Sequence, residues 1–325
     1  MDHSFQPTLV WDAHSGFEAW PHTDLAQLAQ WRDAGVDFVS VNVGYDLQTM
    51  SDTVNALAAF RRFLKAADAF ALVGTMDELQ LARARGQTGV AFDLEGVNVM
   101  NSSLDLLRLY HELGVRQVAL AYNRNSDAGG GCHDDDQGLT AFGRDAIALM
   151  NELGMVVDCS HCGYRTTFEA IEYSTAPVIF SHSNARALCD HERNILDEQA
   201  LACAARGGVV GVNGINLFLG DDSTSTAKLA DHAEYWMHLL GPAHVGVGLD
   251  YFFEDSGAGD HFSDVLAANA DYWPKEQYPG GAITCSRPSQ IRKLGAELLN
   301  RGFSASEVNG VMGQNFARIA ATVWH

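Results

Sequence analysis

The chain has 325 residues, of which 47% are hydrophobic, and its 41 acidic and 21 basic side chains give a formal net charge of −20. This length suits either two average domains or one alternating barrel of about 250 residues or more. The negative charge repels nucleic acid and anionic membranes, so we expect neither as a partner.

The N-terminal region and the cysteines suggest a cytoplasmic protein. Residues 1–7 show no basic segment followed by an apolar run, and no stretch of the chain approaches the roughly 20 apolar residues of a membrane span. Six cysteines in a chain of this length do not form the dense framework of a small secreted fold, so we expect reduced thiols. Cys159 and Cys162 have C-x-x-C spacing, but Cys159 fits better as a small buried residue beside a functional histidine.

Short β-rich runs alternate with helical patterns along the chain, which predicts repeated βα units around a parallel sheet. The predicted strands are residues 8–14, 38–43, 89–95, 117–122, 156–161, 178–182, 209–213 and 245–250, with an extra short run at 70–73. Apolar residues at helical spacing lie between them, and Gly114 and Gly154 are predicted to end two of the helices.

Beyond the eighth strand, the sequence predicts additional helices that pack outside the barrel. One covers residues 289–300, the capping box of Ser304 and Glu307 opens the next, and the last ends near Val323. Two segments, 127–138 and 253–281, are predicted to be long irregular loops at the active face. No linker divides the chain, so we predict one (β/α)₈ barrel domain over residues 1–325 with extra C-terminal helices.

Polar residues stand at the predicted strand ends, where a barrel of this type carries its catalytic groups. These residues are His14, Glu95, Tyr122, His161, His182, Asn213 and Asp250. A single histidine at such a position is often only a hydrogen-bonded core residue, but several at equivalent ends favour a metal site. Imidazole and carboxylate ligands suit zinc, so we predict Zn²⁺ held by Glu95, His161 and His182, with Asp250 moving the proton.

Several motifs carry a resemblance to a known family. They are LEG at 94–96 with SSL at 102–104, GLTAFG at 138–143, VDCSH at 157–161, PVIFSHS at 177–183, RN at 193–194 and GLD at 248–250. Over most of its length, the chain resembles the membrane dipeptidases, also called renal dipeptidases, of the amidohydrolase superfamily. The resemblance implies a zinc-dependent barrel that hydrolyses dipeptides, tolerates a D-residue at the C-terminal position and typically holds two metals.

The resemblance also implies individual roles. Glu95 matches the bridging carboxylate, His161 and His182 match the imidazoles of the second metal, and Asp250 matches the proton-shuttling carboxylate. Arg193 matches the arginine that grips the substrate carboxylate, although a surface salt bridge with Glu192 is the alternative. Tyr122 stands where mammalian members place a histidine that contacts the substrate carbonyl, and it can still donate a hydrogen bond.

The chain departs from the family pattern at the first metal. The family's His-x-Asp motif reads His14-Ser15-Gly16 here, so this metal keeps only His14 and the shared Glu95. One zinc ion is therefore expected, and a second is doubtful. Asp12 lies about 6.6 Å deeper along the strand and is not expected to reach the metal, whereas Glu18 has a longer arm and could fold back.

Three functions remain open from the sequence. The first is hydrolysis of a dipeptide or small N-acyl amino acid, the second is hydrolysis of a non-peptide amide or lactam, and the third is a non-catalytic binding protein with a degenerate metal centre. The sequence also leaves open whether the protein forms a homo-oligomer.

Overall fold

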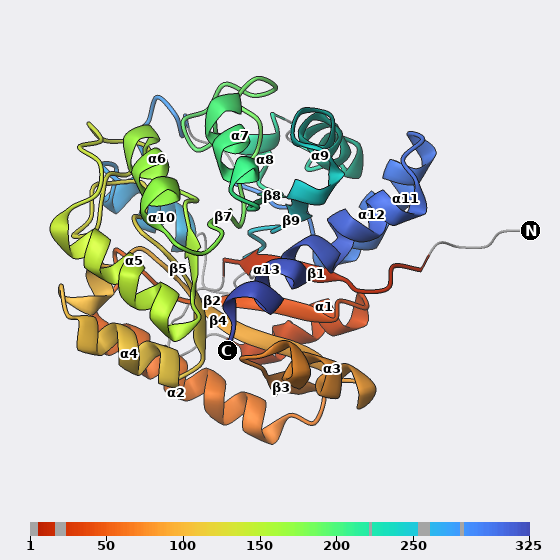
Figure 1. The fold of residues 1–325 in the computed structure, drawn as a ribbon, viewed down its shortest axis with the longest axis horizontal. Helices are drawn as coiled ribbons and strands as arrows, with labels where there is room; N and C mark the ends of the chain where they lie inside the picture. Colours follow the sequence, from red (N-terminus) through yellow and green to blue (C-terminus); the bar gives the residue numbers. More distant parts are fainter. Residues whose placement is uncertain (1–5, 17–23, 221–222, 253–260, 280–282) are drawn as a thin grey trace, which may run out of the picture.

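The computed structural model describes residues 6–16, 24–220, 223–252, 261–279 and 283–325, with only the backbone described at 261–264. Its centre is a parallel sheet that curls into a barrel, in the order β1-β2-β4-β5-β6-β7-β8-β9, with β3 added beside β4 (Figure 1). The strands are β1 Trp11–Ser15, β2 Phe38–Tyr45, β3 Phe70–Leu72, β4 Thr88–Glu95, β5 Val115–Ala119, β6 Val156–Asp158, β7 Ile179–Phe180, β8 Val209–Val212 and β9 Val245–Val247. The predicted (β/α)₈ architecture is therefore confirmed.

The barrel closes between its last and first strands through hydrogen bonds just beyond β9. The Asp250 backbone N–H donates to the His14 carbonyl at 3.0 Å, and the Leu249 N–H donates to Asp12 Oδ1 at 2.9 Å. Asp12 Oδ2 accepts from the Trp31 indole at 2.7 Å, so this carboxylate belongs to the seam and not to a metal site, as its depth in the strand predicted.

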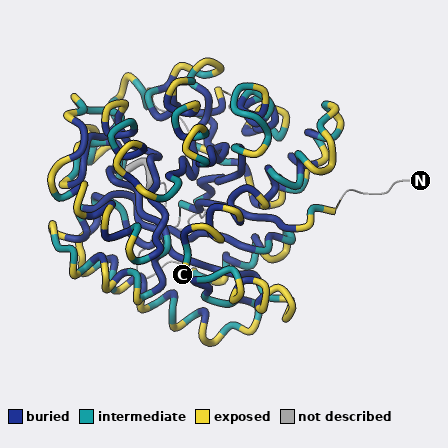
Figure 2. Tube along the Cα trace, viewed as in Figure 1, coloured by how far each residue is buried: buried dark blue, intermediate teal, exposed yellow. Residues whose placement is uncertain are grey.

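Helices surround the sheet, with their buried faces toward it (Figure 2). They are α1 Ala29–Asp33, α2 Met50–Ala66, α3 Met76–Ala84, α4 Leu104–Glu112, α5 Ala141–Leu153, α6 Tyr164–Tyr173, α7 Asp197–Ala205, α8 Asn216–Leu219, α9 Thr226–Leu240, α10 His261–Ala268, α11 Ile291–Asn300, α12 Ala305–Asn309 and α13 Asn315–Val323. The predicted stops at Gly114 and Gly154 are confirmed, because both glycines have positive φ just after α4 and α5.

The C-terminal helices begin and end close to their predicted bounds. The capping box of Ser304 and Glu307 opens α12. Phe316 and Ile319 of α13 join a buried cluster with Trp11 and Phe38 at the beginnings of β1 and β2. The last helix therefore covers the end of the barrel opposite to the carboxyl ends of the strands.

Four predicted strands extend two or three residues too far. His161, His182 and Asp250 lie two or three residues beyond the ends of β6, β7 and β9. His161 and Asp250 have φ of 66° and 55°, a left-handed conformation that a continuing strand excludes. Tyr122 likewise lies beyond β5, so these side chains project from the first residues of the loops.

The two predicted irregular loops differ in outcome. Residues 127–138 form an irregular segment, as predicted, whereas the stretch 253–281 contains α10, which the sequence analysis missed. Residues 253–260 and 280–281 of that stretch lie outside the described part of the chain.

All six cysteines are free thiols. Among the described residues, no helix has the length and apolar character needed to cross a membrane.

Candidate active site

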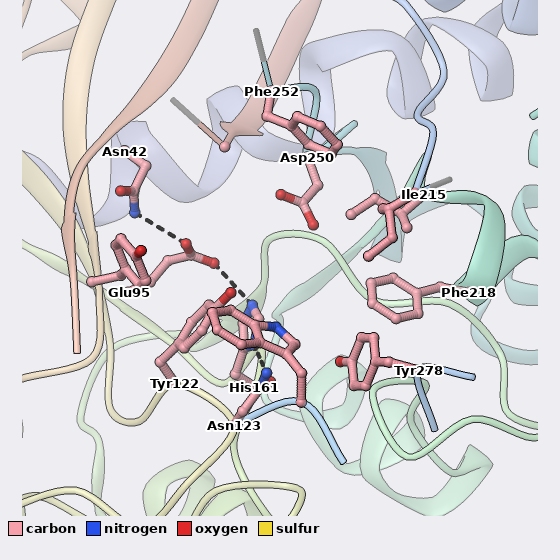
Figure 3. A pocket seen from close by; sticks show the side chains of 14 residues that line it. Asn42, Glu95, Tyr122, Asn123, His161, Ile215, Phe218, Asp250, Phe252 and Tyr278 are labelled. Atoms are coloured by element: carbon pink, nitrogen blue, oxygen red, sulfur yellow. Dashed lines mark hydrogen bonds and ion pairs between the residues drawn. The ribbon is translucent and has the colours of Figure 1, made fainter. Parts of the chain in front are cut away.

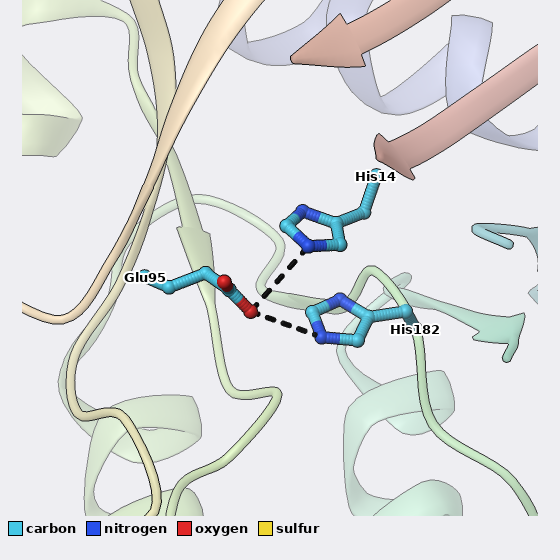
Figure 4. Close-up of side chains that lie close together, drawn as sticks. All are labelled: His14, Glu95 and His182. Atoms are coloured by element: carbon cyan, nitrogen blue, oxygen red, sulfur yellow. Dashed lines mark ion pairs between the residues drawn. The ribbon is translucent and has the colours of Figure 1, made fainter. Parts of the chain in front are cut away.

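Three imidazoles converge on one carboxylate oxygen at the carboxyl end of the barrel. Glu95 Oε1 lies 2.9 Å from His161 Nε2 and 3.4 Å from the Nε2 atoms of both His14 and His182. The Nε2 atoms of His161 and His182 are themselves 3.0 Å apart. All four side chains are buried, and Figure 4 shows His14, Glu95 and His182 pointing toward one another.

The ligand atoms of His14, Glu95 and His182 all lie within 4.8 Å of one another. The sequence grouped Glu95 with His161 and His182 instead, and left His14 to a separate, incomplete site. In the structure, these four residues form a single cluster, because the His14 and His182 rings stack with centroids 4.0 Å apart.

A polar neighbour lies beside the other nitrogen of each imidazole. His161 Nδ1 lies 2.7 Å from Asn123 Oδ1, and His14 Nδ1 lies 3.2 Å from Asp93 Oδ1. His182 Nδ1 lies 2.6 Å from Ser181 Oγ, whose own hydrogen is donated to Asp158. Since Nδ1 of His161 and Nδ1 of His182 each face an acceptor, the Nε2 atoms of these two residues can present their lone pairs to the centre of the cluster.

Burial shapes the charges of the cluster. It lowers the pKa of His161 and His182 well below the usual range, which keeps these imidazoles neutral. Burial raises the pKa of Glu95 to about 8, against the lowering effect of His14. Burial would also lower the pKa of His14, but Asp93 and Glu95 outweigh it and raise that pKa well above its ordinary value.

This donor set fits a divalent metal ion. The Nε2 lone pairs of His161 and His182 face one another across 3.0 Å, beside a buried carboxylate. This arrangement is unfavourable without a positive charge between the two nitrogens. His14 Nε2 also has no hydrogen-bond partner among the described residues, although it is buried. A cation bound here would satisfy these atoms and favour the ionised form of Glu95.

Asp250 lies opposite Glu95 across the cavity (Figure 3). Its Oδ2 accepts a hydrogen bond from Asn213 Nδ2 at 3.0 Å, and its Oδ1 lies 3.6 Å from His14 Nε2. One oxygen is therefore held by the protein while the other faces the cluster, which is suitable for a group that exchanges a proton there.

Gly16 lines the same cavity, and it has no side chain that could bind a metal ion. A Cβ atom at this position would lie 2.9 Å from Asp250 Oδ1, so any side chain here would crowd the aspartate. Glu18, the residue considered as a replacement ligand, lies outside the described residues.

Arg193 is buried beside the cluster and not on the surface. Its Nη2 donates to the His182 carbonyl at 3.3 Å, and its guanidinium lies 5.3 Å from the centre of the Phe218 ring. The alternative of a surface salt bridge with Glu192 is wrong, since Glu192 pairs with His133 at 2.8 Å. Arg193 Nε has no hydrogen-bond partner among the described residues, so it can donate to an anion.

Tyr122 lines the cavity, and its ring stacks on His161 with centroids 4.4 Å apart. Burial raises the pKa of its phenol well above the ordinary value, so the group remains a neutral hydrogen-bond donor.

Sequence reasoning missed the polar residues that support the cluster. Asn42 donates to Glu95 Oε2 at 3.3 Å and to Asp93 Oδ1 at 3.2 Å, and Ser40 Oγ donates to Asp93 Oδ2 at 2.6 Å. A signal was present, because Ser40 and Asn42 alternate with valines in one strand and Asp93 shares the parity of Glu95 in another.

The fold and this cluster are typical of parallel-barrel enzymes whose metal centre lies at the carboxyl ends of the strands. Residues 6–269 match the model of the membrane dipeptidase family, peptidase family M19. The chain belongs to this family, as the sequence motifs indicated.

Individual relatives agree with this assignment. An uncharacterized dipeptidase of Schizosaccharomyces pombe is 35% identical over 254 residues, which cover 71% of this chain and 60% of that protein. An amidohydrolase from Pseudomonas aeruginosa has a TM-score of 0.87 and 26% identity, with 97% of this chain and 96% of that chain covered. A metallo peptidase from Rhodobacter sphaeroides, liganded with a phosphinate mimic of the dipeptide L-Ala-D-Ala, has a TM-score of 0.77 and 20% identity, with 98% and 100% covered.

Proposed function

We propose that this protein is a zinc-dependent hydrolase that cleaves the amide bond of a dipeptide or a small N-acyl amino acid. The observation that carries the proposal is the convergence of His14, His161 and His182 on one oxygen of Glu95, with Asp250 across the cavity. Membership of the membrane dipeptidase family and the dipeptidase relatives support this class of substrate.

Glu95, His161 and His182 would hold a single zinc ion, with His14 close to the same carboxylate oxygen. Neutral imidazoles and a carboxylate are the ligands of catalytic zinc, and the low pKa values of His161 and His182 support this role. When bound, zinc lowers the pKa of a coordinated water to about 7 and polarises the scissile carbonyl. Gly16 provides no ligand for a second ion.

Asp250 would accept the proton that the attacking water loses and deliver it to the amine that departs when the C–N bond breaks. The hydrogen bond from Asn213 to Oδ2 supports this role, because it orients the carboxylate and leaves Oδ1 toward the cluster. Arg193 would bind the substrate carboxylate through its buried Nε, which has no hydrogen-bond partner in the part of the chain that the structure describes. The neutral phenol of Tyr122 would donate to the substrate carbonyl.

The proposal is tested by assaying zinc-loaded protein against dipeptides with L- and D-termini, N-acyl amino acids and lactams. We expect turnover of at least one dipeptide or N-acyl amino acid, abolished by a chelator and restored by zinc. Asp250→Asn keeps the shape of the side chain but loses the proton acceptor, so it should lower kcat by about 10²-fold or more while zinc content stays unchanged. Hydrolysis of lactams alone, or full activity of Asp250→Asn, would contradict this proposal.

A further inference from the structure

Two apolar walls flank the cavity that lies in front of Glu95 and Asp250. The first wall consists of Tyr45, Tyr122 and Trp273, and the second wall of Ile215, Phe218 and Tyr278. Figure 3 shows the second wall as a column on the side opposite to Glu95 and Tyr122.

Ring contacts hold each wall together. In the first wall, the Tyr122 ring centroid lies 5.3 Å from that of Tyr45 and 5.9 Å from that of Trp273, both in edge-to-face geometry. In the second wall, the centroids of Phe218 and Tyr278 are 6.4 Å apart. These contacts restrict the rings, so the walls present preformed and largely apolar surfaces to a bound molecule.

Trp273 and Tyr278 come from one segment, residues 271–278, which we call the strap. Asn123 Nδ2 donates to the Tyr272 carbonyl and Arg124 Nη1 to the Asp271 carbonyl, both at 3.0 Å. At the other end of the strap, the Glu192 N–H donates to Gln277 Oε1 at 2.9 Å. The Tyr278 hydroxyl lies 3.2 Å from His133 Nε2, so a buried side chain fixes its position.

The charged groups that line the cavity are unfavourable for an acidic side chain. The ionisable residues at its surface include Glu95 and Asp250, and no lysine or arginine lines it among the described residues. The buried guanidinium of Arg193 is the cation beside Phe218, and it suits a single carboxylate.

We propose that this cavity selects dipeptides whose side chains are large and not acidic, either aromatic or branched aliphatic, and that Trp273 is a specificity-determining residue. The inference rests on the proposed function for its reaction and adds the substrate class. An apolar side chain between the walls removes area from water on both of its faces. A second carboxylate in the same place would lose its hydration beside Glu95 and Asp250 without a partner.

The first test compares kcat/KM across two L-dipeptide series, X-Ala and Ala-X, with X as Leu, Phe, Ala, Glu and Lys. In at least one series, Leu or Phe should exceed Glu by about tenfold or more, since apolar pockets discriminate on this scale. Hydrolysis of the Glu and Lys peptides at the rate of the Leu and Phe peptides would overturn the inference and leave the proposed function standing.

A second test measures binding without turnover. Isothermal titration of the same peptides into zinc-loaded Asp250→Asn should give the same ranking, with Leu and Phe peptides ahead of the Glu peptide. If this ranking appears while the wild-type protein hydrolyses neither a dipeptide nor an N-acyl amino acid, the proposed reaction fails and the selectivity of the cavity stands. Equal affinity for all the peptides would overturn the inference.

Trp273→Ala tests the named residue. It should lower kcat/KM for the preferred large peptide about tenfold relative to Ala-Ala, with zinc content unchanged, and Trp273→Phe should recover most of the loss. Tyr173→Ala, which removes an exposed aromatic ring from α6, is the matched control and should change neither value. An equal loss of kcat/KM on every peptide in Trp273→Ala would show a general structural role and contradict the assignment.

Discussion

His182 is held by a serine that is itself held by a buried carboxylate. Ser181 Oγ donates to Asp158 and faces His182 Nδ1 at 2.6 Å, so it accepts the Nδ1 hydrogen. Asp158 is fixed in turn by the backbone N–H groups of Ser160 and Ser181 at 2.9 and 3.1 Å. Such outer contacts orient a ligand and increase its basicity, so we propose that Ser181 is a positioning residue for the centre.

Ser181→Ala should therefore weaken zinc binding by about 10- to 100-fold, because the His182 ring loses the acceptor that fixes its tautomer. Zinc affinity is measured by competition with a chromophoric chelator, and the free energy of unfolding of the zinc-free protein by urea titration. Ser183→Ala is the matched control, since Ser183 is also buried and its hydroxyl has no described partner. Equal zinc affinities in the two variants would remove the positioning role.

At the scale of residues, the sequence indicated the ionisable members of the cluster but not the polar residues that support them. His14, Glu95, His161, His182 and Asp250 stood out because ionisable groups followed apolar runs. Asn123 and Ser181 did not, because amides and hydroxyls are common in loops and their partners come from distant strands. The aromatic walls were missed for a related reason, since Trp273 reaches the cavity through contacts of the strap with residues 123–124 and 191–192.

At the scale of elements, the residues that begin or end a helix act locally, whereas the positions at which strands end depend on distant contacts. Gly154 and the capping box of Ser304 and Glu307 act within one helical turn, so they could be recognised from the sequence. Where β6 and β9 end depends on the left-handed residues His161 and Asp250. Those conformations cost energy in non-glycine residues and are stabilised by surrounding tertiary contacts, which a local pattern does not contain.

The first turn of α2 offers a test of such a local signal. Asp52 accepts from the Thr49 hydroxyl at 2.7 Å and the Thr49 N–H at 3.0 Å, and these bonds lower its pKa. A lowered carboxyl pKa contributes stability above the unfolded value near 4, and this contribution is lost as the pH falls through the folded pKa.

Asp52→Asn should therefore lower the free energy of unfolding by about 0.5 kcal/mol at pH 7, a value reduced by solvent exposure, and by less near pH 3. Urea titrations at the two pH values measure this difference. Asp105→Asn, in the first turn of α4, is the comparison variant. A destabilisation by Asp52→Asn that is as large at pH 3 as at pH 7 would exclude the charged cap as its cause.

At the scale of the whole molecule, the barrel depends on the seam between its last and first strands. Asp12 joins three parts of the chain there, because it accepts from the Leu249 N–H and the Trp31 indole while it belongs to β1. The backbone bond from Asp250 to the His14 carbonyl lies beside it, so the same seam brings two site residues together.

Asp12→Ala should destabilise the fold by about 2–4 kcal/mol, because two buried donors lose this acceptor. Urea unfolding measures the loss, and Asp68→Ala, an exposed aspartate, should leave stability within about 0.5 kcal/mol of the wild type. A similar small effect for Asp12→Ala would show that the seam closes without its carboxylate.

The proposed function requires one metal centre formed by His161, His182 and Glu95, with His14 beside them. Elemental analysis of protein purified after growth in zinc-supplemented medium tests this claim directly. We predict a single zinc ion per chain, lost in a His161→Ala, His182→Ala double variant that still folds by circular dichroism. A metal content near zero in the wild-type protein, or one that the double variant leaves unchanged, would contradict it.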